Sequence, residues 1–175
     1  GMFDIINPLK VNHINRLDLN EDAINYLKWE DLGIHAVIKG EYAATEKEIT
    51  FKLSLYDVVN RRYLVGKLYR GQKSHLRQIM HKFADETVFQ LTNETGMAQT
   101  KISFVSVESG HKELFVIDYD GYEKSLKQLS KERSLILFPA WSSDGKKIVF
   151  TSYQKNNPIL KVVSLEKGKN KIIVN

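Results

Sequence analysis

The sequence contains no cysteine, and this absence removes several kinds of chemistry at once. Disulfide bonds, thiolate nucleophiles and zinc sites built on cysteine are all excluded. An oxidising compartment is compatible with such a composition but is not required by it.

Long hydrophobic runs are missing as well. No apolar stretch approaches the roughly 18–20 residues that a membrane-spanning helix needs, so we expect no membrane span. The first residues, Gly1-Met2-Phe3-Asp4, lack the basic segment and apolar core of a signal peptide. They therefore carry no information about the native compartment.

Neither sign of charge dominates the chain. It carries 26 Lys and Arg against 21 Asp and Glu, for a net charge of +5 and a pI near 9.2. A basic balance raises the possibility of a nucleic acid or a membrane surface as partner. Because the lysines are scattered among acidic residues, we favour ordinary solvated faces and expect no nucleic-acid partner.

The common catalytic motifs do not occur. G-x-S-x-G, G-x-x-x-x-G-K-[ST], G-x-G-x-x-G and H-E-x-x-H are all absent, which excludes those nucleophile elbows, phosphate cradles and zinc helices. The sequence thus yields no catalytic, cofactor-binding or metal-ligating residue and predicts no cofactor. The histidines are dispersed: His13, His35, His75, His81 and His111.

Three weaker signals have more ordinary explanations. His81 and Asp85 share a helix face and could bind a metal, but a surface pair is the favoured interpretation. Asp118-Tyr-Asp-Gly121 resembles the start of a calcium loop, yet it lacks the further acidic ligands, so we favour a turn. Trp141, beside a predicted hairpin, is interpreted as a core aromatic rather than a platform for bases.

Residues 3–97 are expected to form an α/β (or α+β) domain, a sheet with helices packed on it. A helix is predicted over 20–33, with Asn20 as N-cap and Gly33 after its end. Strands are predicted over 34–42, 49–56 and 63–69. A second helix is predicted over 74–93, ended by Gly96; its apolar positions follow the spacing of one buried face: Leu76, Ile79, Met80, Phe83, Thr87, Val88 and Leu91.

Residues 98–175 contain an internal repeat with a period of 46, from 147 − 101. Lys101-Ile-Ser-Phe-Val-Ser106 aligns with Lys147-Ile-Val-Phe-Thr-Ser152, with Lys, Ile, Phe and Ser identical. Periods of this length with four short strands are typical of β-propeller blades. The expected strands are 101–107, 112–118 and 123–129, then 136–141, 146–152, 159–165 and 170–174. This is an all-β, truncated propeller segment of about two blades.

The strongest local pattern is the hairpin Phe138–Ser152. Pro139 is expected to begin a strand, where its missing N–H is tolerated. Asp144-Gly145 predicts a two-residue turn with positive φ. Since a propeller needs about 4–8 blades and each blade buries its faces on its neighbours, we expect uncovered apolar faces and association or strand exchange between copies.

The hairpin Pro139-Ala-Trp-Ser-Ser-Asp-Gly-Lys-Lys-Ile-Val-Phe150 resembles the repeat of TolB-type propellers, with Ser143 where that repeat usually has proline. The same repeat occurs in prolyl-oligopeptidase-like enzymes. Three preceding segments, however, look like the TolB amino-terminal domain running into its first blade: Leu32–Gly40, His81–Thr92 and Asp118–Tyr122.

This resemblance implies a non-enzymatic, periplasmic protein-interaction scaffold of the Tol–Pal envelope system, which serves outer-membrane integrity, cell division and protein import. It implies a Pal-type peptidoglycan-associated lipoprotein and a TolA-like protein as partners of the full-length protein. It also implies an amino-terminal domain over 3–97 without its first strand and helix, and the first two blades over 98–175. The alternatives are the propeller of a serine peptidase whose catalytic domain lies elsewhere, and a basic nucleic-acid-binding domain.

Overall fold

The computed structural model describes residues 3–6, 24–154, 157–165 and 170–174, the last of these as backbone only. The expected N-cap Asn20 and His13 lie outside these residues. The chain divides into two compact units, residues 1–96 and 97–175, and each is considered separately.

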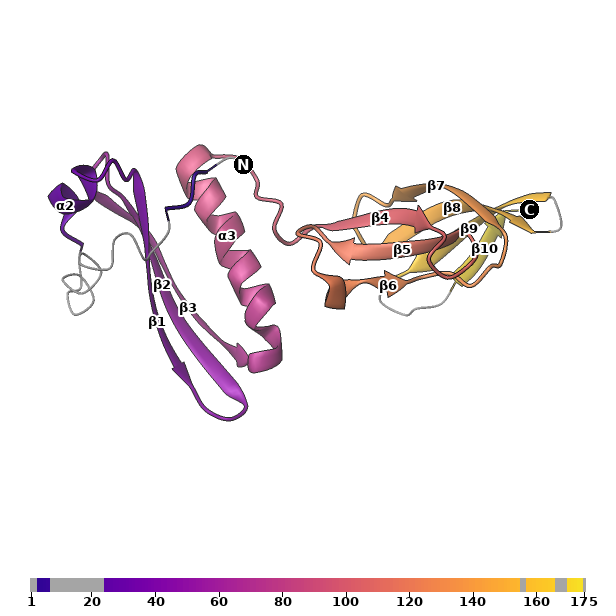
Figure 1. Ribbon diagram of the computed structural model, residues 1–175, viewed down its shortest axis with the longest axis horizontal. Helices are drawn as coiled ribbons and strands as arrows, with labels where there is room; N and C mark the ends of the chain where they lie inside the picture. The colour runs from indigo at the N-terminus through magenta and orange to yellow at the C-terminus, as the bar shows by residue number, and fades with distance from the viewer. Residues whose placement is uncertain (1–2, 7–23, 155–156, 166–169, 175) are drawn as a thin grey trace. The chain divides into compact units, whose positions relative to one another are not determined.

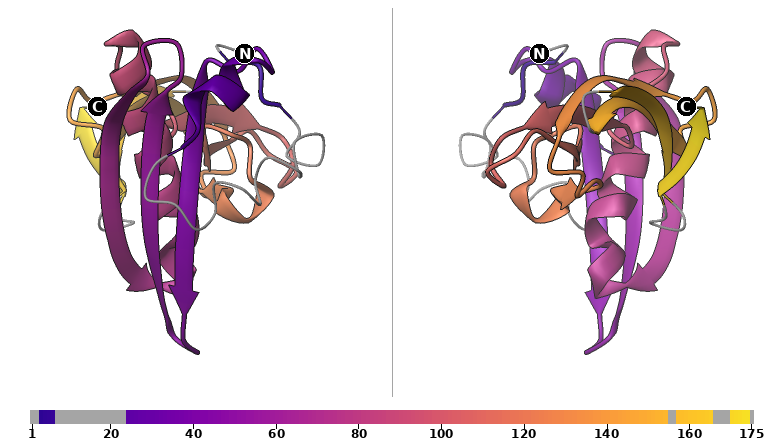
Figure 2. Two further views of the ribbon diagram at one scale, coloured as in Figure 1. Left: turned by 90° about the vertical axis from the view of Figure 1, so that its left-hand side faces the viewer. Right: turned by 90° about the vertical axis from the view of Figure 1, so that its right-hand side faces the viewer.

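The first unit is an antiparallel sheet with one long helix along one face (Figures 1 and 2). Its strands lie in the order β1-β2-β3 because each is joined to the next by a short connection. Their bounds are Ala36–Ala44, Glu48–Asp57 and Arg62–Gln72. The predicted alternation in β2 is confirmed from Ile49 to Leu55, since Ile49, Leu53 and Leu55 are buried and Phe51 is partly buried. It fails at Tyr56, which is predicted on the exposed face but is buried in a second core cluster with Trp29 and Val58.

Of the helix predicted over 20–33, residues 20–23 lie outside the described residues, and over 24–33 the helix is shorter than predicted. Helix α2 spans Tyr26–Glu30, and its N-cap is Asn25, whose Oδ1 accepts a hydrogen bond from the Lys28 N–H at 3.3 Å. Because Asn25 is the N-cap, the helix begins later than predicted. Gly33 has φ of +70°, but it lies two residues beyond the C-cap Asp31 and not at the C′ position predicted for it.

The long helix α3 spans Leu76–Thr92 and is preceded by a 3₁₀ turn, η2, at Lys73–His75. It ends at Asn93, which has φ of +59° and donates its N–H to the Phe89 carbonyl, so the expected stop at Gly96 is wrong. Gly96 has another role. A Cβ at this position would lie 2.5 Å from Asp85 Cα, so only glycine lets the chain pass so close to the helix.

The predicted buried face of α3 is confirmed over most of its length. Ile79, Phe83 and Thr87 are buried, and Phe83 packs with Leu53 and Leu55 of β2. Met80 and Leu91 are partly buried against the same cluster, and Val88 is half-buried. Leu76 is 39% exposed, contrary to prediction, because it occupies the first helical position, before the helix reaches that cluster.

The second unit contains two antiparallel sheets, of three and then four strands, as the repeat predicts. They form no closed barrel within the described residues. The first sheet has the order β4-β5-β6, with bounds Lys101–Ser106, Glu113–Asp118 and Lys127–Gln128. The second has the order β10-β9-β8-β7; β7 to β10 span Leu135–Trp141, Lys147–Gln154, Asn157–Ser164 and Asn170–Val174.

The strand predicted over 123–129 is largely wrong. A 3₁₀ turn, η3, occupies Glu123–Ser125, and only β6 is extended. The reason is the Ser125 hydroxyl, which donates to the Tyr122 carbonyl at 2.6 Å and accepts from the Asp118 N–H at 2.9 Å. This side chain stabilises a turn where alternation alone predicts a strand.

The β7–β8 hairpin corrects the predicted two-residue turn. The Ser142 N–H donates to the Lys147 carbonyl at 3.0 Å, which leaves a loop of four residues between them. Gly145 has positive φ, +66°, whereas Asp144 does not. Asp144 instead accepts hydrogen bonds through Oδ1 from the Ser142 hydroxyl at 2.6 Å and the Lys146 N–H at 3.0 Å. Side-chain hydrogen bonds thus stabilise a wider turn.

Pro139 lies within β7 rather than at its start. The register of β7 against β8 shifts between Leu137 and Ala140, and Phe138 at this bulge has φ of +55°. Because β7 is an edge strand, the missing proline N–H leaves no hydrogen bond unmade at the bulge.

The core of the second unit lies between its two sheets. Leu114 of β5, Ile136 of β7, Ile148 and Phe150 of β8 and Val163 of β9 are all fully buried there. Trp141 packs against this cluster, which confirms its interpretation as a core aromatic.

Candidate interaction surface

A buried polar network joins the two sheets of the second unit. Glu113 begins β5 and is only 2% exposed. Its carboxylate accepts hydrogen bonds from the Ser130 hydroxyl, the Glu132 N–H at 3.0 Å and the Arg133 N–H at 2.8 Å. Arg133 has φ of +51°, so Glu113 holds the connection between β6 and β7 in a backbone conformation that arginine rarely adopts.

A buried ion pair continues this network into the second sheet. Glu132 Oε2 accepts from Lys161 Nζ of β9, and both side chains are 7% exposed. The same oxygen accepts from Gln154 Nε2 at 2.7 Å and Ser152 Oγ at 3.3 Å. The carboxylate is therefore paired and hydrogen-bonded, as a buried charge must be.

The electrostatics of Glu113 follow from these contacts. Burial alone would raise the pKa of its carboxyl, but the hydrogen bonds from Ser130, Glu132 and Arg133 outweigh burial and lower the pKa below its ordinary value. Glu113 is thus held in its charged form. The hydrogen bonds from Glu132 and Arg133 tie down the residues just before β7, which begins at Leu135.

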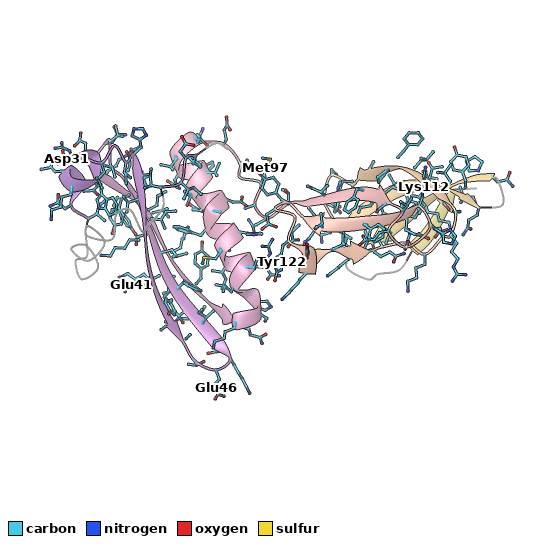
Figure 3. The ribbon with its side chains drawn as sticks, in the orientation of Figure 1. Asp31, Glu41, Glu46, Met97, Lys112 and Tyr122 are labelled. Atoms are coloured by element: carbon cyan, nitrogen blue, oxygen red, sulfur yellow. The ribbon has the colours of Figure 1, made fainter. Side chains whose placement is uncertain are left out.

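A hollow of about 340 Å³ lies beside the last residues of β4 and the middle of β7. Apolar side chains and backbone form most of its wall, and Lys112 adds one cation. Lys112 lies at the end of the second unit opposite Met97 and Tyr122 (Figure 3). The lining residues are Val105, Ser106, Val107, Lys112, Ile136, Leu137, Phe138 and Pro139.

Two apolar side chains at this hollow are exposed to solvent. Phe138 is 75% exposed and Val107 is 63% exposed. Phe138 also has positive φ, which is strained for an aromatic residue. An apolar wall beside a strand edge that has no partner among the described residues can take up an extended segment of chain. We regard this hollow as the candidate interaction surface.

Sequence reasoning by itself does not find this surface. It places Phe138 inside the strand predicted over 136–141, and the usable signal is the proline after it, which marks a bulge or an edge. The Glu132–Lys161 pair is missed as well. Its signal is a lysine on the inward face of a predicted strand, two residues before the apolar Val163.

The weak sequence signals are not among the residues that line the hollow. Asp118-Tyr-Asp-Gly121 forms a turn, as favoured, since the Gly121 N–H donates to the Asp118 carbonyl at 2.9 Å and Gly121 has φ of +73°. Asp118 also pairs with Lys101. His81 and Asp85 lie on α3 in the first unit. The described residues bring together no group of three or more His, Cys, Asp or Glu that could hold a metal.

The first unit has its own polar site and its own exposed apolar side chains. Burial would raise the pKa of Asp57, but hydrogen bonds from Asn60 and Arg62 outweigh it and lower that pKa. These bonds stabilise the β2–β3 turn.

Exposed apolar side chains also occur in the first unit: Ile38 and Tyr42 of β1 are 53% and 74% exposed. Within the described ranges, no helix is both long and apolar enough to cross a membrane.

Comparison with known proteins places both units in one family. A family model described as the TolB amino-terminal domain matches residues 1–64, and one described as the TolB beta propeller domain matches residues 88–175. The Tol-Pal system protein TolB of Desulfosudis oleivorans is 32% identical over 149 residues, which cover 85% of this chain and 34% of the relative. The protein TolB homolog of Chlorobium chlorochromatii is 31% identical over 169 residues, covering 97% and 38%.

A solved structure supports the same relationship. The crystal structure of TolB from Acinetobacter baumannii matches with a TM-score of 0.78 at 28% identity, over 86% of this chain and 38% of that one. The chain spans about a third of the length of the curated relatives it matches.

Proposed function

The chain belongs to the TolB family, and from this premise we propose that the full-length protein is a non-catalytic scaffold that binds other proteins in the Tol–Pal system of the cell envelope. The observation that carries the proposal is the match of two TolB family models, in order, to residues 1–64 and 88–175. The match to the amino-terminal model argues against the peptidase alternative, because it lies outside the propeller repeat that peptidases share.

The proposed partners follow from the family and from the type of surface on the second unit. We propose a Pal-type peptidoglycan-associated lipoprotein and a TolA-like protein, with the periplasm as the compartment. Curated relatives carry the name Tol-Pal system protein. The exposed side chains of Val107 and Phe138 and the apolar hollow beside them provide the sort of surface that contacts protein rather than phosphate.

The direct test is binding of the full-length gene product to the soluble domain of a Pal-type lipoprotein. We expect saturable binding by calorimetry at about 0.15 M salt, where exposed charges are screened beyond roughly 8 Å. An unrelated acidic protein of the same size serves as control. Absence of binding at this salt concentration overturns the proposed partner.

The two alternatives have separate tests. Labelling of the full-length gene product by a fluorophosphonate probe would indicate a serine hydrolase and contradict the non-catalytic proposal. Affinity for duplex DNA that falls steeply with salt would indicate a nucleic-acid-binding protein. We expect neither result.

We also propose that the 175-residue chain by itself associates with other copies through its uncovered apolar faces. Sedimentation at increasing concentration would detect this association.

A further inference from the structure

The positive charge of the first unit is concentrated in one segment, residues 58–84. This segment contains seven Lys and Arg and two His but no Asp or Glu. It covers β3, the η2 turn and the first half of α3. Arg61, Arg62 and Lys67 pair with carboxylates that lie outside the segment. Arg70 forms no ion pair with any residue that the structure describes.

Strand β3 lies at one border of the first sheet (Figure 2), and among the described residues it pairs with β2 alone. Its two halves differ. In the first half the register against β2 shifts, and the Tyr63 ring lies over Gly66, where a Cβ would collide with the tyrosine hydroxyl. A bulge and a covering ring both hinder the addition of a strand. Residues 67–72 keep a regular register with β2, so this half of the edge is open to a further strand.

The open half of β3 presents an apolar and a cationic side chain on the same face. Leu68 and Arg70 are two residues apart in a strand and therefore point to the same side of the sheet. Leu68 is 59% exposed, and Arg70 is exposed as well. Lys67 points to the opposite side, where its Nζ lies 3.9 Å from Glu86 Oε2 of α3. Leu68 and Arg70 thus lie on the side of the sheet away from the helix.

We propose that residues 67–72 of β3 bind an extended acidic segment of a partner protein as an added strand. Alternate N–H and C=O groups of β3 point away from β2 and provide the hydrogen bonds. A carboxylate of the partner lies opposite Arg70, and an apolar residue two positions away lies against Leu68. Lys52 of β2, directly opposite Leu68, already pairs with Glu41 at 3.4 Å, so Arg70 provides the charge recognition.

The charge of the edge identifies the occupant. A second copy that paired through the same edge would bring two basic strands together, with Lys67 and Arg70 of each copy close to those of the other. Like charges at facing positions destabilise a strand pair, whereas a segment rich in Asp and Glu is attracted there. This edge belongs to the first unit, and the surface proposed for the Pal-type lipoprotein belongs to the second. The two proposals therefore stand or fall separately.

Binding of two labelled peptides to the 175-residue chain tests the proposal. One peptide has the core Val-Thr-Glu-Thr-Glu and the other has the reverse order, because the direction of the added strand is open. We expect one of them to bind saturably by fluorescence anisotropy at about 0.15 M salt, where exposed charges are screened beyond roughly 8 Å. Saturation should slow amide hydrogen exchange at residues 67–72 and leave β1 unchanged. The same peptides with Gln in place of Glu should bind more weakly.

A charge reversal on β3 locates the site. Arg70→Glu should weaken peptide binding about tenfold, because it replaces an attraction by a repulsion at the facing position. Lys82→Glu makes the same change of net charge at an exposed position of α3 and is the matched control. It should change the affinity less than about twofold, since exposed charges act over short distances at this salt concentration. Equal losses in the two variants would show general attraction to a basic surface and overturn the proposed site.

Methylation of backbone nitrogens in the peptide separates strand addition from charge attraction and leaves the protein unchanged. Only alternate amides of an added strand point toward β3, so methylating one alternate set should weaken binding by about tenfold or more, and methylating the other set should have little effect. Equal effects of the two sets overturn strand addition. Absence of binding by both peptides overturns the proposal as well, and binding of anionic lipid vesicles in their place would identify a membrane surface as the partner.

Discussion

Strands β4 and β8 carry four identical residues at equivalent positions, yet they lie in different environments. Ile148 of β8 is fully buried, whereas its counterpart Ile102 is 47% exposed. Phe150 is fully buried, whereas Phe104 is only partly buried. The face of β8 that bears Ile148 and Phe150 packs on Leu114 of the first sheet. The equivalent face of β4 meets no such sheet within its own described unit. Burial is thus decided by neighbours rather than by the residues themselves.

The largest expected effect comes from the buried ion pair of the second sheet. Lys161 of β9 has Phe115 as its repeat counterpart, from 161 − 46, so the same position is charged in one repeat and apolar in the other. Lys161→Met leaves the Glu132 carboxylate buried without its cation and should lower the free energy of unfolding by about 3–5 kcal/mol. Urea unfolding followed by Trp141 fluorescence in a Trp29→Phe background measures the second unit selectively.

The matched control for this pair is Phe115→Met, which keeps the position apolar and should cost less than about 1.5 kcal/mol. Adding Glu132→Gln to Lys161→Met should recover a large part of the loss, because the buried charge is removed. If the single and double variants are equally unstable, the pair is not the source of the effect.

An effect of the same order comes from one of the repeated phenylalanines. Phe150→Ala should cost about 3–5 kcal/mol, as expected for a fully buried aromatic residue. Phe104→Ala should cost less than half as much, because part of its ring is already in solvent. The ring of Phe104 stacks on that of Phe115, with centroids 5.9 Å apart, and the variant loses this contact. Urea unfolding followed by Trp141 fluorescence measures the loss of unfolding free energy in both variants. Equal losses would show that β4 and β8 are equally buried in solution.

The smallest expected effect is the loss of folding stability at acidic pH. The folded-state pKa of Glu113 is lowered, so its stabilisation is fully present above the unfolded-state pKa, about 4.3, and is lost as pH falls through the folded-state value. Unfolding between pH 7 and pH 3 should therefore show a steeper acid loss for the natural chain than for Glu113→Gln. In the second repeat the equivalent position, from 113 + 46, is the apolar residue Ile159, so this carboxylate occurs in the first repeat only.

The acid experiment requires the signal from Trp141 alone. Asp57 in the first unit also has a lowered pKa and will lose its own stabilisation in acid. Parallel pH profiles for the natural chain and Glu113→Gln would contradict the role given to the hydrogen bonds from Ser130, Glu132 and Arg133.

Prediction from sequence works best for short-range patterns, namely the spacing of apolar residues along one strand or helix. The alternation of Ile49, Leu53 and Leu55 identifies β2 and its buried face, and the spacing of Ile79, Phe83 and Thr87 identifies the buried face of α3. These predictions succeed because strand and helix geometry convert sequence spacing directly into a face. The misplaced start of α2 and the wider turn at Ser142–Lys147 have a different origin, since single side-chain hydrogen bonds select among competing local conformations.

By itself, the sequence determined the two-part organisation, the helix and strand faces and the 46-residue repeat with its β-propeller character. Only the tertiary structure decided which copy of the repeat is buried, that Glu132 meets Lys161 across 29 residues, and that residues of β4 and β7 together line an apolar hollow. The physical reason is that periodicity is a property of neighbouring residues, whereas burial, ion pairing and an open strand edge depend on which distant segments occupy the adjacent space.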